Sequence, residues 1–360
     1  MLCPVCLLGE ESTWAPRRIA RNRLVSPPEI SVFLPSVRRP STLKDALDAL
    51  VAQTFRDFEV LMVFNFAETE TKAVVDQYES QLRMQRIHAT GGLVEAANLA
   101  VKAANGEIFI RTDDDAVGSP HWLEGIHETF ASSADIGGVT GPTTIPQANL
   151  DGRDLTLLYQ RMDNGSLPWR LMGKLYKGWI LEGKGNEVSR FLDSGAFTLG
   201  SNFVAARSLP GPLEVDHMEA CNWAARTVLL RRIGGFDPAY LELGEYHEPD
   251  ASFKIRKLGY KVVFNPKAAI EHRPSILGIF KARPKAFTRS QNFLLFYFRH
   301  IRPRRPQGWL RFLVYLGMMN GYWCYKAFCT RDYRPVLGVL GTVVGAIRYA
   351  PELFRPRSAS

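Results

Sequence analysis

Three consecutive aspartates, Asp113, Asp114 and Asp115, follow residues 107–111, a run that predicts a buried strand. Like charges packed this closely repel one another, so the triplet costs stability unless a cation or hydrogen-bond donors neutralise it. Hard divalent cations such as Mg²⁺ and Mn²⁺ prefer carboxylate oxygens and bridge them to phosphates. Open α/β sheets bind ligands at the carboxyl ends of their strands. The triplet therefore predicts metal-dependent chemistry on a phosphorylated substrate, with a solvated acidic loop or a helix start near Ser119 as the simpler alternative.

The elements that must position these acids alternate along the chain. Short apolar runs predict strands, and apolar residues at i, i+3 and i+4 predict helices between them. The expected strands are 30–34, 58–64, 86–88, 107–112 and 261–264, and the expected helices are 42–53, 69–82, 93–104 and 251–258. This alternation predicts an α/β fold with a mostly parallel sheet and right-handed crossovers. Between residues 140 and 200 the rhythm is lost, which predicts a lid or substrate loop near the site.

The positive charge is concentrated at the C-terminal end. The net charge is +9, and residues 276–360 hold 15 Lys and Arg against 2 Asp and Glu, so the remainder is net acidic. We therefore expect no nucleic-acid partner, but a tail that contacts an anionic membrane surface. The apolar segments 309–329 and 336–347 favour interfacial helices, since the second is too short to span a bilayer unaided. A membrane-spanning hairpin and ordinary soluble packing stay open.

The five cysteines are scattered and do not suggest a disulfide framework, so we expect a reducing compartment. Cys3 and Cys6 have the spacing of a zinc knuckle, but no second pair completes a four-ligand site. Residues 1–28 lack the layout of a secretory signal and are expected to form a flexible lead-in. Residues 29–275 would then form the catalytic domain and residues 276–360 a basic, aromatic-rich helical tail.

Several motifs stand in a fixed order from residue 29 to residue 274. They are the strand–proline–basic opening at 32–39, QTFRDFEV at 53–60, the aspartate triplet, IGGFD at 233–237, GYKVVFNP at 259–266, and His272. With these motifs in register, the chain resembles the family 2 glycosyltransferases of the GT-A fold, which invert the configuration of the transferred sugar. The resemblance implies a nucleotide-sugar donor, Mg²⁺ or Mn²⁺, and a glycan or lipid-linked acceptor at the cytoplasmic face of the membrane. The motif of processive synthases is absent, which favours transfer of a single sugar.

The resemblance also implies residue roles. Asp115 would hold the metal ion, Asp113 would reach the ribose or the metal's waters, and His272 would add a metal or diphosphate contact. Glu248 would be the general base, with Asp250 orienting it or capping a helix. The donor would contact Pro35, Arg38, Asn65, Asp113 and Asp114, and the acceptor would contact Asp216, Glu219 and Asn222.

Two departures from the family pattern leave alternatives open. The usual Glu-Asp pair is replaced by His247-Glu248, and the usual Asp-Asp-Gly-Ser after the second strand is replaced by Asn65-Phe66-Ala67-Glu68. Phe64 or Phe66 would then stack on the nucleotide base, whose identity stays open. A nucleotidyltransferase is one alternative, although it would normally show a glycine-rich loop after the first strand. A catalytically idle membrane scaffold is the other.

Overall fold

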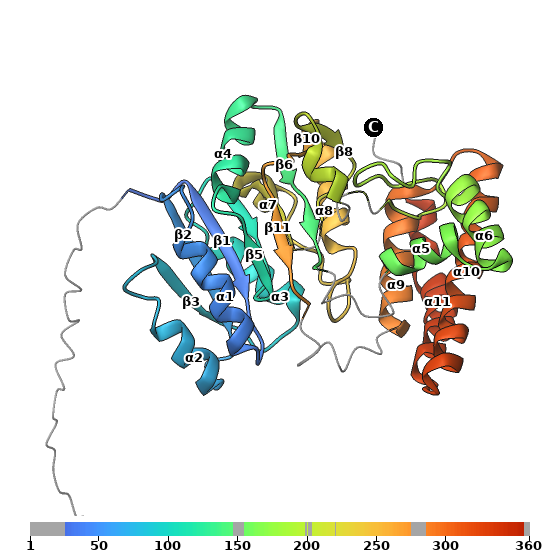
Figure 1. Ribbon diagram of the computed structural model, residues 1–360, viewed down its shortest axis with the longest axis horizontal. Helices are drawn as coiled ribbons and strands as arrows, with labels where there is room; N and C mark the ends of the chain where they lie inside the picture. Colours follow the sequence, from blue (N-terminus) through green and yellow to red (C-terminus); the bar gives the residue numbers. More distant parts are fainter. Residues whose placement is uncertain are drawn as a thin grey trace, which may run out of the picture.

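The computed structural model describes residues 26–146, 155–198, 200, 204–219, 221–274 and 286–355. The predictions for Cys3, Cys6 and most of the N-terminal lead-in therefore lie outside the described residues, as does the predicted domain boundary at 275/276. The catalytic fold is an eight-stranded sheet flanked by helices, and the C-terminal helices stand together at one side of it (Figure 1).

The main sheet has the order β3-β2-β1-β4-β9-β6-β10-β8, and a small second sheet has the order β5-β11-β7. The strands are β1 (Ile30–Pro35), β2 (Phe58–Phe64), β3 (Met84–His88), β4 (Ile108–Arg111), β5 (Ala116–Gly118), β6 (Ile136–Thr140), β7 (Thr143–Thr144), β8 (Leu213–Val215), β9 (Trp223–Arg226), β10 (Lys261–Phe264) and β11 (Ile270–His272). Strands β3, β2, β1 and β4 pair in parallel, as do β6 and β10. Strand β9 pairs antiparallel with β4 and β6, and β8 pairs antiparallel with β10. The predicted mostly parallel α/β sheet is confirmed.

The helices alternate with the strands and then continue into the tail. They are α1 (Pro40–Val51), α2 (Thr69–Asp76), α3 (Leu93–Ala103), α4 (Trp122–Ser132), α5 (Leu155–Asn164), α6 (Leu167–Gly173), α7 (Thr227–Arg232), α8 (His247–Lys257), α9 (Ala286–Phe296), α10 (Pro306–Thr330) and α11 (Leu337–Tyr349). Shorter turns are η2 (Lys174–Ile180), η4 (Val204–Ser208), η6 (Tyr297–Ile301), η7 (Arg334–Val336) and η8 (Ala350–Phe354). Helix α2 is shorter than predicted, and α8 starts at His247, four residues before its predicted start.

The mostly apolar sequence of β1 follows from its burial on both faces. Phe33 joins one hydrophobic cluster, while Ile30, Val32 and Leu34 join the other. Successive strand residues point to opposite faces, so a strand covered on both sides is apolar at most positions. The exception in β1 is Ser31, whose buried hydroxyl donates to Glu59 Oε1 of β2 at 2.7 Å. This rigid sheet fixes the places at which its strands end.

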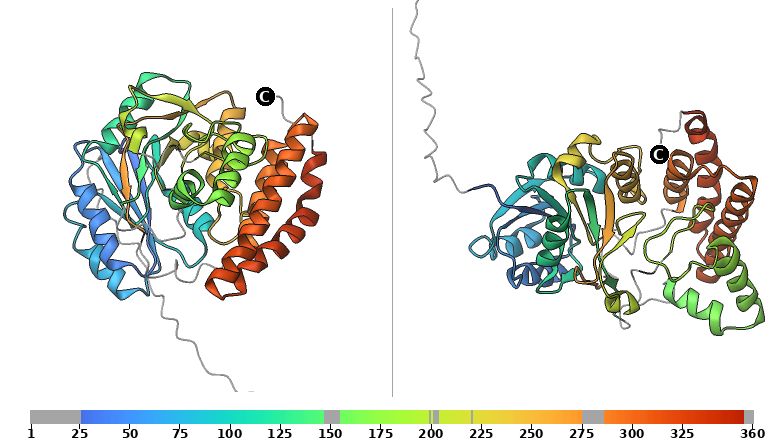
Figure 2. Two further views of the ribbon diagram at one scale, coloured as in Figure 1. Left: turned by 45° about the vertical axis from the view of Figure 1, so that its right-hand side comes forward. Right: turned by 90° about the horizontal axis from the view of Figure 1, so that it is seen from above.

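The segment between residues 140 and 200 is more regular than predicted. It contains the helices α5 and α6 and the turn η2, which pack beside the tail (Figure 2). A ring contact of 6.3 Å joins Trp169 of α6 to Tyr325 of α10. The sequence did not predict these helices because Pro, Gly and Trp are frequent between residues 140 and 200 and interrupt the pattern, and because the tail helix that they contact is far away in the chain.

The tail begins with a helix that belongs to the catalytic core. Phe293 and Phe296 of α9 share the hydrophobic cluster that contains Phe33, Phe109 and Trp223 of the main sheet. Among the described helices, one is long and apolar enough to cross a membrane, namely the segment Arg334–Phe354. A third of its most apolar 18-residue stretch is buried inside the protein.

Candidate active site

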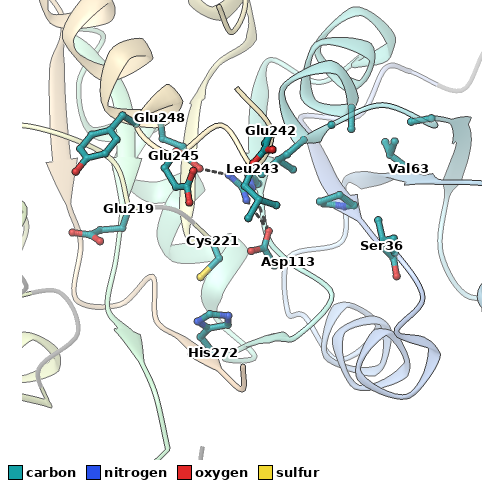
Figure 3. A pocket seen from close by; sticks show the side chains of 18 of the residues that line it. Ser36, Val63, Asp113, Glu219, Cys221, Glu242, Leu243, Glu245, Glu248 and His272 are labelled. Atoms are coloured by element: carbon teal, nitrogen blue, oxygen red, sulfur yellow. Dashed lines mark hydrogen bonds and ion pairs between the residues drawn. The ribbon is translucent and has the colours of Figure 1, made fainter. Parts of the chain in front are cut away.

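A cavity of about 910 Å³ opens at the carboxyl ends of β1, β2 and β4. One wall includes Pro35, Arg38, Arg39, Phe64, Asn65 and Asp113, and the second wall includes Phe191, Phe197, Glu219, Glu242, Glu245, Tyr246, Glu248 and Arg289. Figure 3 shows Asp113, His272 and the acidic residues of the second wall around this space. The cavity therefore lies where an open α/β sheet binds its ligands.

The three aspartates have different surroundings. The Asp113 side chain is 20% exposed and faces the cavity, where it accepts a hydrogen bond of 3.0 Å from Arg111 Nη2. Asp114 is buried, accepts a hydrogen bond of 2.7 Å from Ser36 Oγ, and lies 3.0 Å from Arg39 Nη2. Burial raises the pKa of Asp114 to about 7 despite the opposing effect of Arg39. A direct donor contact by Asp114 would require a rearrangement, because its carboxylate is already held behind the cavity wall.

Asp115 is also buried, and it links two distant segments. Its Oδ2 accepts a bond of 2.5 Å from Arg39 Nη1, and its Oδ1 lies 3.2 Å from His272 Nε2. His272 reaches this position because β11 pairs with β5, where His272 is opposite Ala116. Arg39 lines the cavity, and its guanidinium forms ion pairs with Asp114 and Asp115.

The side chains around His272 fit a hard divalent cation. Ligand atoms of Asp113, Cys221 and His272 all lie within 4.8 Å of one another, with the Asp115 carboxylate beside the imidazole. Burial raises the pKa of the Cys221 thiol well above its ordinary value, so the thiol stays protonated and is a poor ligand for Mg²⁺ or Mn²⁺. The carboxylates and the imidazole are the donors that such a cation would use. The predicted metal set of Asp115, Asp113 and His272 stays a proposal.

Arg111 connects the aspartate triplet to the predicted base. It is 3% exposed at the end of β4, and it donates to Asp113 and to Glu248 Oε1. Burial opposes its charged form, yet the two carboxylates raise the pKa of Arg111 above its ordinary value. The Arg111 guanidinium thus holds both carboxylates at the same cavity.

Glu248 lies in the first turn of α8 and lines the cavity. Its Oε2 lies 3.1 Å from His247 Nδ1, which also contacts Gly244 O at 2.5 Å. Burial lowers the pKa of His247, so the imidazole stays neutral at ordinary pH. The His-Glu pair therefore places the glutamate, not the histidine, at the cavity.

Asp250 points away from the cavity, toward the tail. It accepts hydrogen bonds from His300 Nε2 at 2.7 Å, Arg299 Nη1 at 3.1 Å and Tyr240 Oη at 3.1 Å. Despite burial, His300 and Lys254 lower the pKa of Asp250 well below its ordinary value. Any catalytic role for Asp250 would therefore act through the position of α8.

Three of the residues predicted to contact the donor, besides Asp113, lie in the cavity wall. Pro35, Arg38 and Asn65 all line it, and Asn65 Oδ1 accepts a hydrogen bond of 3.0 Å from Ala67 N. Of the two phenylalanines considered for base stacking, Phe64 lines the cavity. The ring of Phe66 instead packs on His88, with the centroids 4.9 Å apart.

Of the three residues predicted to contact the acceptor, one lines the cavity and two do not. Glu219 lines the cavity and accepts a hydrogen bond of 2.9 Å from Ser189 Oγ. Asp216 lies in an ion-pair network with Arg190 and Arg256, at 3.4 and 3.3 Å.

Asn222 is completely buried. Its Oδ1 accepts a hydrogen bond of 2.9 Å from Trp122 Nε1, and its Nδ2 donates to Pro142 O and Ala268 O. These contacts give Asp216 and Asn222 structural roles in the present conformation, because their polar atoms are used inside the fold.

Sequence reasoning missed several cavity residues, namely Arg111, Phe191, Phe197, Glu242, Tyr246 and Arg289. Arg111 had one usable signal, since a charged residue at the end of a buried strand requires a partner. The remaining residues lie in irregular segments or in the tail, where periodicity carries no information about which side chains meet.

The sheet order, the rim of acidic residues and the flanking helices define a GT-A fold. Residues 31–181 match the family model described as Glycosyl transferase family 2, so this part of the chain is a family 2 glycosyltransferase domain. The chain is 31% identical over 132 residues to an uncharacterized glycosyltransferase of Nostoc sp., a match that covers 36% of this chain and 39% of that protein.

A second relative is the glucosyl-dolichyl phosphate glucuronosyltransferase of Haloferax volcanii, 24% identical over 114 residues, or 31% of this chain and 36% of that protein. The chain thus matches about two fifths or less of each relative. Among solved structures, a mannosyltransferase from Pyrobaculum calidifontis in complex with GDP-Man and Mn²⁺ covers 90% of this chain and 88% of its own, with a TM-score of 0.50 and 16% identity. That likeness concerns the fold alone.

Proposed function

We propose that the protein is an inverting, metal-dependent glycosyltransferase that moves one sugar from a nucleotide-diphosphate sugar to an acceptor hydroxyl. One observation carries the proposal: Asp113 and Glu248 face the same cavity, and Arg111 binds both. A metal-binding carboxylate and a separate carboxylate base are the two groups that this reaction requires.

In the proposed reaction, the acceptor oxygen bonds to the anomeric carbon while the bond from that carbon to the diphosphate oxygen breaks. Glu248 accepts the proton of the acceptor hydroxyl, and the hydrogen bond from Arg111 orients this carboxylate before the reaction. Asp113, Asp115 and His272 would hold the cation. A cation held there would supply positive charge to offset the negative charge that develops on the departing diphosphate. Displacement from the opposite face inverts the anomeric configuration.

The names of similar proteins support the finer assignments. The Pyrobaculum enzyme is described in complex with GDP-Man and Mn²⁺, which favours a nucleotide sugar and a divalent cation here. The Haloferax relative is named for a dolichyl phosphate substrate, which favours a lipid-linked acceptor. We therefore propose Mg²⁺ or Mn²⁺ as cofactor and a lipid-linked glycan as acceptor.

Sugar transfer tests the proposal directly. UDP-, GDP- and TDP-sugars are supplied with Mn²⁺ and lipid-linked acceptors to the native protein and to Asp113→Ala, Glu248→Gln and Asp216→Asn. We expect Glu248→Gln to lower the transfer rate by about 10²–10⁴-fold, the range of general-base catalysis, while nucleotide binding is retained. Asp113→Ala should abolish the metal dependence, and Asp216→Asn is the matched acidic control. Turnover of nucleoside triphosphates instead would indicate a nucleotidyltransferase, and no turnover with any donor would indicate an idle scaffold.

We also propose that the tail lies on the anionic, cytoplasmic face of a membrane. Of the 18 exposed large apolar side chains in the described part of the chain, 11 lie in the tail, 4 lie on α6 and η2, and 3 lie elsewhere. On η7 and α11 they recur at helical spacing as Val336, Leu337, Leu340, Val343 and Ile347. An apolar stripe beside basic residues such as Arg331 and Arg348 is typical of an interfacial helix.

Vesicle flotation tests the membrane proposal. The native protein should float with phosphatidylglycerol vesicles and much less with phosphatidylcholine vesicles. Val343→Glu with Ile347→Glu should abolish flotation, because two charges enter the exposed stripe of α11. Val228→Glu is the control, since Val228 is 65% exposed but lies on α7. Equal flotation of all three proteins would contradict the assignment of this surface.

A further inference from the structure

The segment that carries Glu248 has an unusual backbone. Residues 237–250 run from the IGGFD motif into α8, and within it Glu242, Gly244 and Tyr246 have positive φ angles of 57°, 67° and 75°. A positive φ is strained for residues other than glycine, so two of these three positions need support from their surroundings. Residues 242, 243, 245 and 246 form part of the cavity wall just before the proposed base.

The support comes from α9 and η6, at the start of the tail. Asn292, which is fully buried, accepts a hydrogen bond of 2.9 Å from Leu241 N and donates one of 3.1 Å to Leu241 O. One residue further, Thr288 Oγ1 donates to Glu242 Oε2 at 2.8 Å. The α9 side chains therefore satisfy the polar groups of this loop at the point where its strained backbone begins.

The same unit holds the rest of the segment. The ring of Tyr246 stacks on Phe296, with centroids 5.6 Å apart and planes 28° apart. Arg299 of η6 donates to Asp237 at 2.8 Å and to Asp250 at 3.1 Å, at the two ends of the segment. From the opposite side the loop has no room to retreat, because a Cβ at Gly92 would lie 2.8 Å from Glu242 O.

We propose that α9 and η6 act as a clamp that positions residues 241–248, and that Asn292 is the principal positioning residue of this clamp. The tail would then do more than contact a membrane, since its first helix completes the wall of the active site. The consequence for catalysis rests on the proposed role of Glu248, whereas the clamp itself does not.

The test uses the full-length chain with Asn292→Leu and Thr288→Val, which keep side-chain size and remove the hydrogen bonds to the loop. Ser290→Ala is the matched control, because Ser290 is buried on the same helix and its hydroxyl makes no hydrogen bond with the described residues. Hydrogen–deuterium exchange of residues 242–248 is measured together with kcat and KM for transfer and with nucleotide affinity.

We expect exchange at residues 242–248 to rise about 10-fold or more in Asn292→Leu, less in Thr288→Val, and not in Ser290→Ala. The kcat of transfer should fall about 30-fold in Asn292→Leu with nucleotide affinity nearly unchanged, whereas a purely structural role would lower only the thermal midpoint. Should both variants exchange and react like Ser290→Ala, the clamp is refuted. If the native protein transfers no sugar at all, the proposed function fails and the exchange data alone decide the clamp.

Discussion

Replacing Arg111 by methionine tests the electrostatic arrangement of the site. Arg111 is 3% exposed and donates to Asp113 through Nε and Nη2, at 3.3 and 3.0 Å, and to Glu248 through Nη1. Methionine fills much of the same volume but leaves two neighbouring carboxylates without the cation that neutralises them. The variant should therefore lose stability, and it should also gain affinity for any other cation that can replace the guanidinium.

The size of the expected stability loss follows from the burial of the ion pair between Arg111 and Glu248. Removing one partner of a buried ion pair costs about 3–5 kcal/mol, because the other charge stays in a medium of low dielectric constant. With about 2.1 cal/mol/K of unfolding entropy per residue and roughly 300 folded residues, this cost lowers the unfolding midpoint by about 5 to 8 °C. Arg190→Met is the matched control. Arg190 is 32% exposed and lies 3.4 Å from Asp216, so its removal should cost about 1 kcal/mol or less.

Thermal unfolding is measured first in EDTA and then with Mn²⁺. In EDTA, Arg111→Met should unfold about 5 to 8 °C below the native protein. Adding Mn²⁺ should raise the unfolding midpoint of Arg111→Met by more than it raises the midpoint of the native protein or of Arg190→Met, because a ligand that binds the folded state stabilises it. An Arg111→Met midpoint within 1 °C of the Arg190→Met midpoint would refute the idea that Arg111 neutralises the two carboxylates. An equal Mn²⁺ response in all three proteins would refute the link between Arg111 and the cation site.

Three further outcomes are expected. The free energy of unfolding should fall as the pH drops below about 6.5, because burial lowers the pKa of His247 and His300 and the unfolded chain therefore binds more protons. Urea titrations at several pH values should show that this free energy depends less steeply on pH in His300→Gln, by up to about 1.4 kcal/mol per pH unit. Asn222→Ala should destabilise the fold by about 3–5 kcal/mol, since three buried hydrogen bonds are lost, and an unchanged urea midpoint would contradict this. Glu219→Gln should raise the KM for the acceptor several-fold, while Asp216→Asn leaves it unchanged. Equal KM values in the two variants would contradict a contact between Glu219 and the acceptor.

The sequence predicted the sheet well because burial dictates composition. A parallel strand covered on both faces is mostly apolar, and β1, β2 and β4 are recognisable for that reason. The same reasoning could not say which aspartate of the triplet faces the cavity. That choice depends on Ser36 and Arg39, which lie more than 70 residues earlier and hold Asp114 and Asp115 behind the wall.

Asp250 shows most clearly what a linear reading cannot supply. Its position two residues after Glu248 suggests a role in the reaction or in capping the helix, and both interpretations use only nearby residues. The structure instead gives it Arg299 and His300 as partners, about 50 residues further along the chain. A buried carboxylate requires cations or donors, but the sequence does not say which ones approach. Since those donors belong to the tail, the catalytic domain and the tail are one physical unit around α8, and a boundary drawn from composition alone divides the groups that position the proposed base.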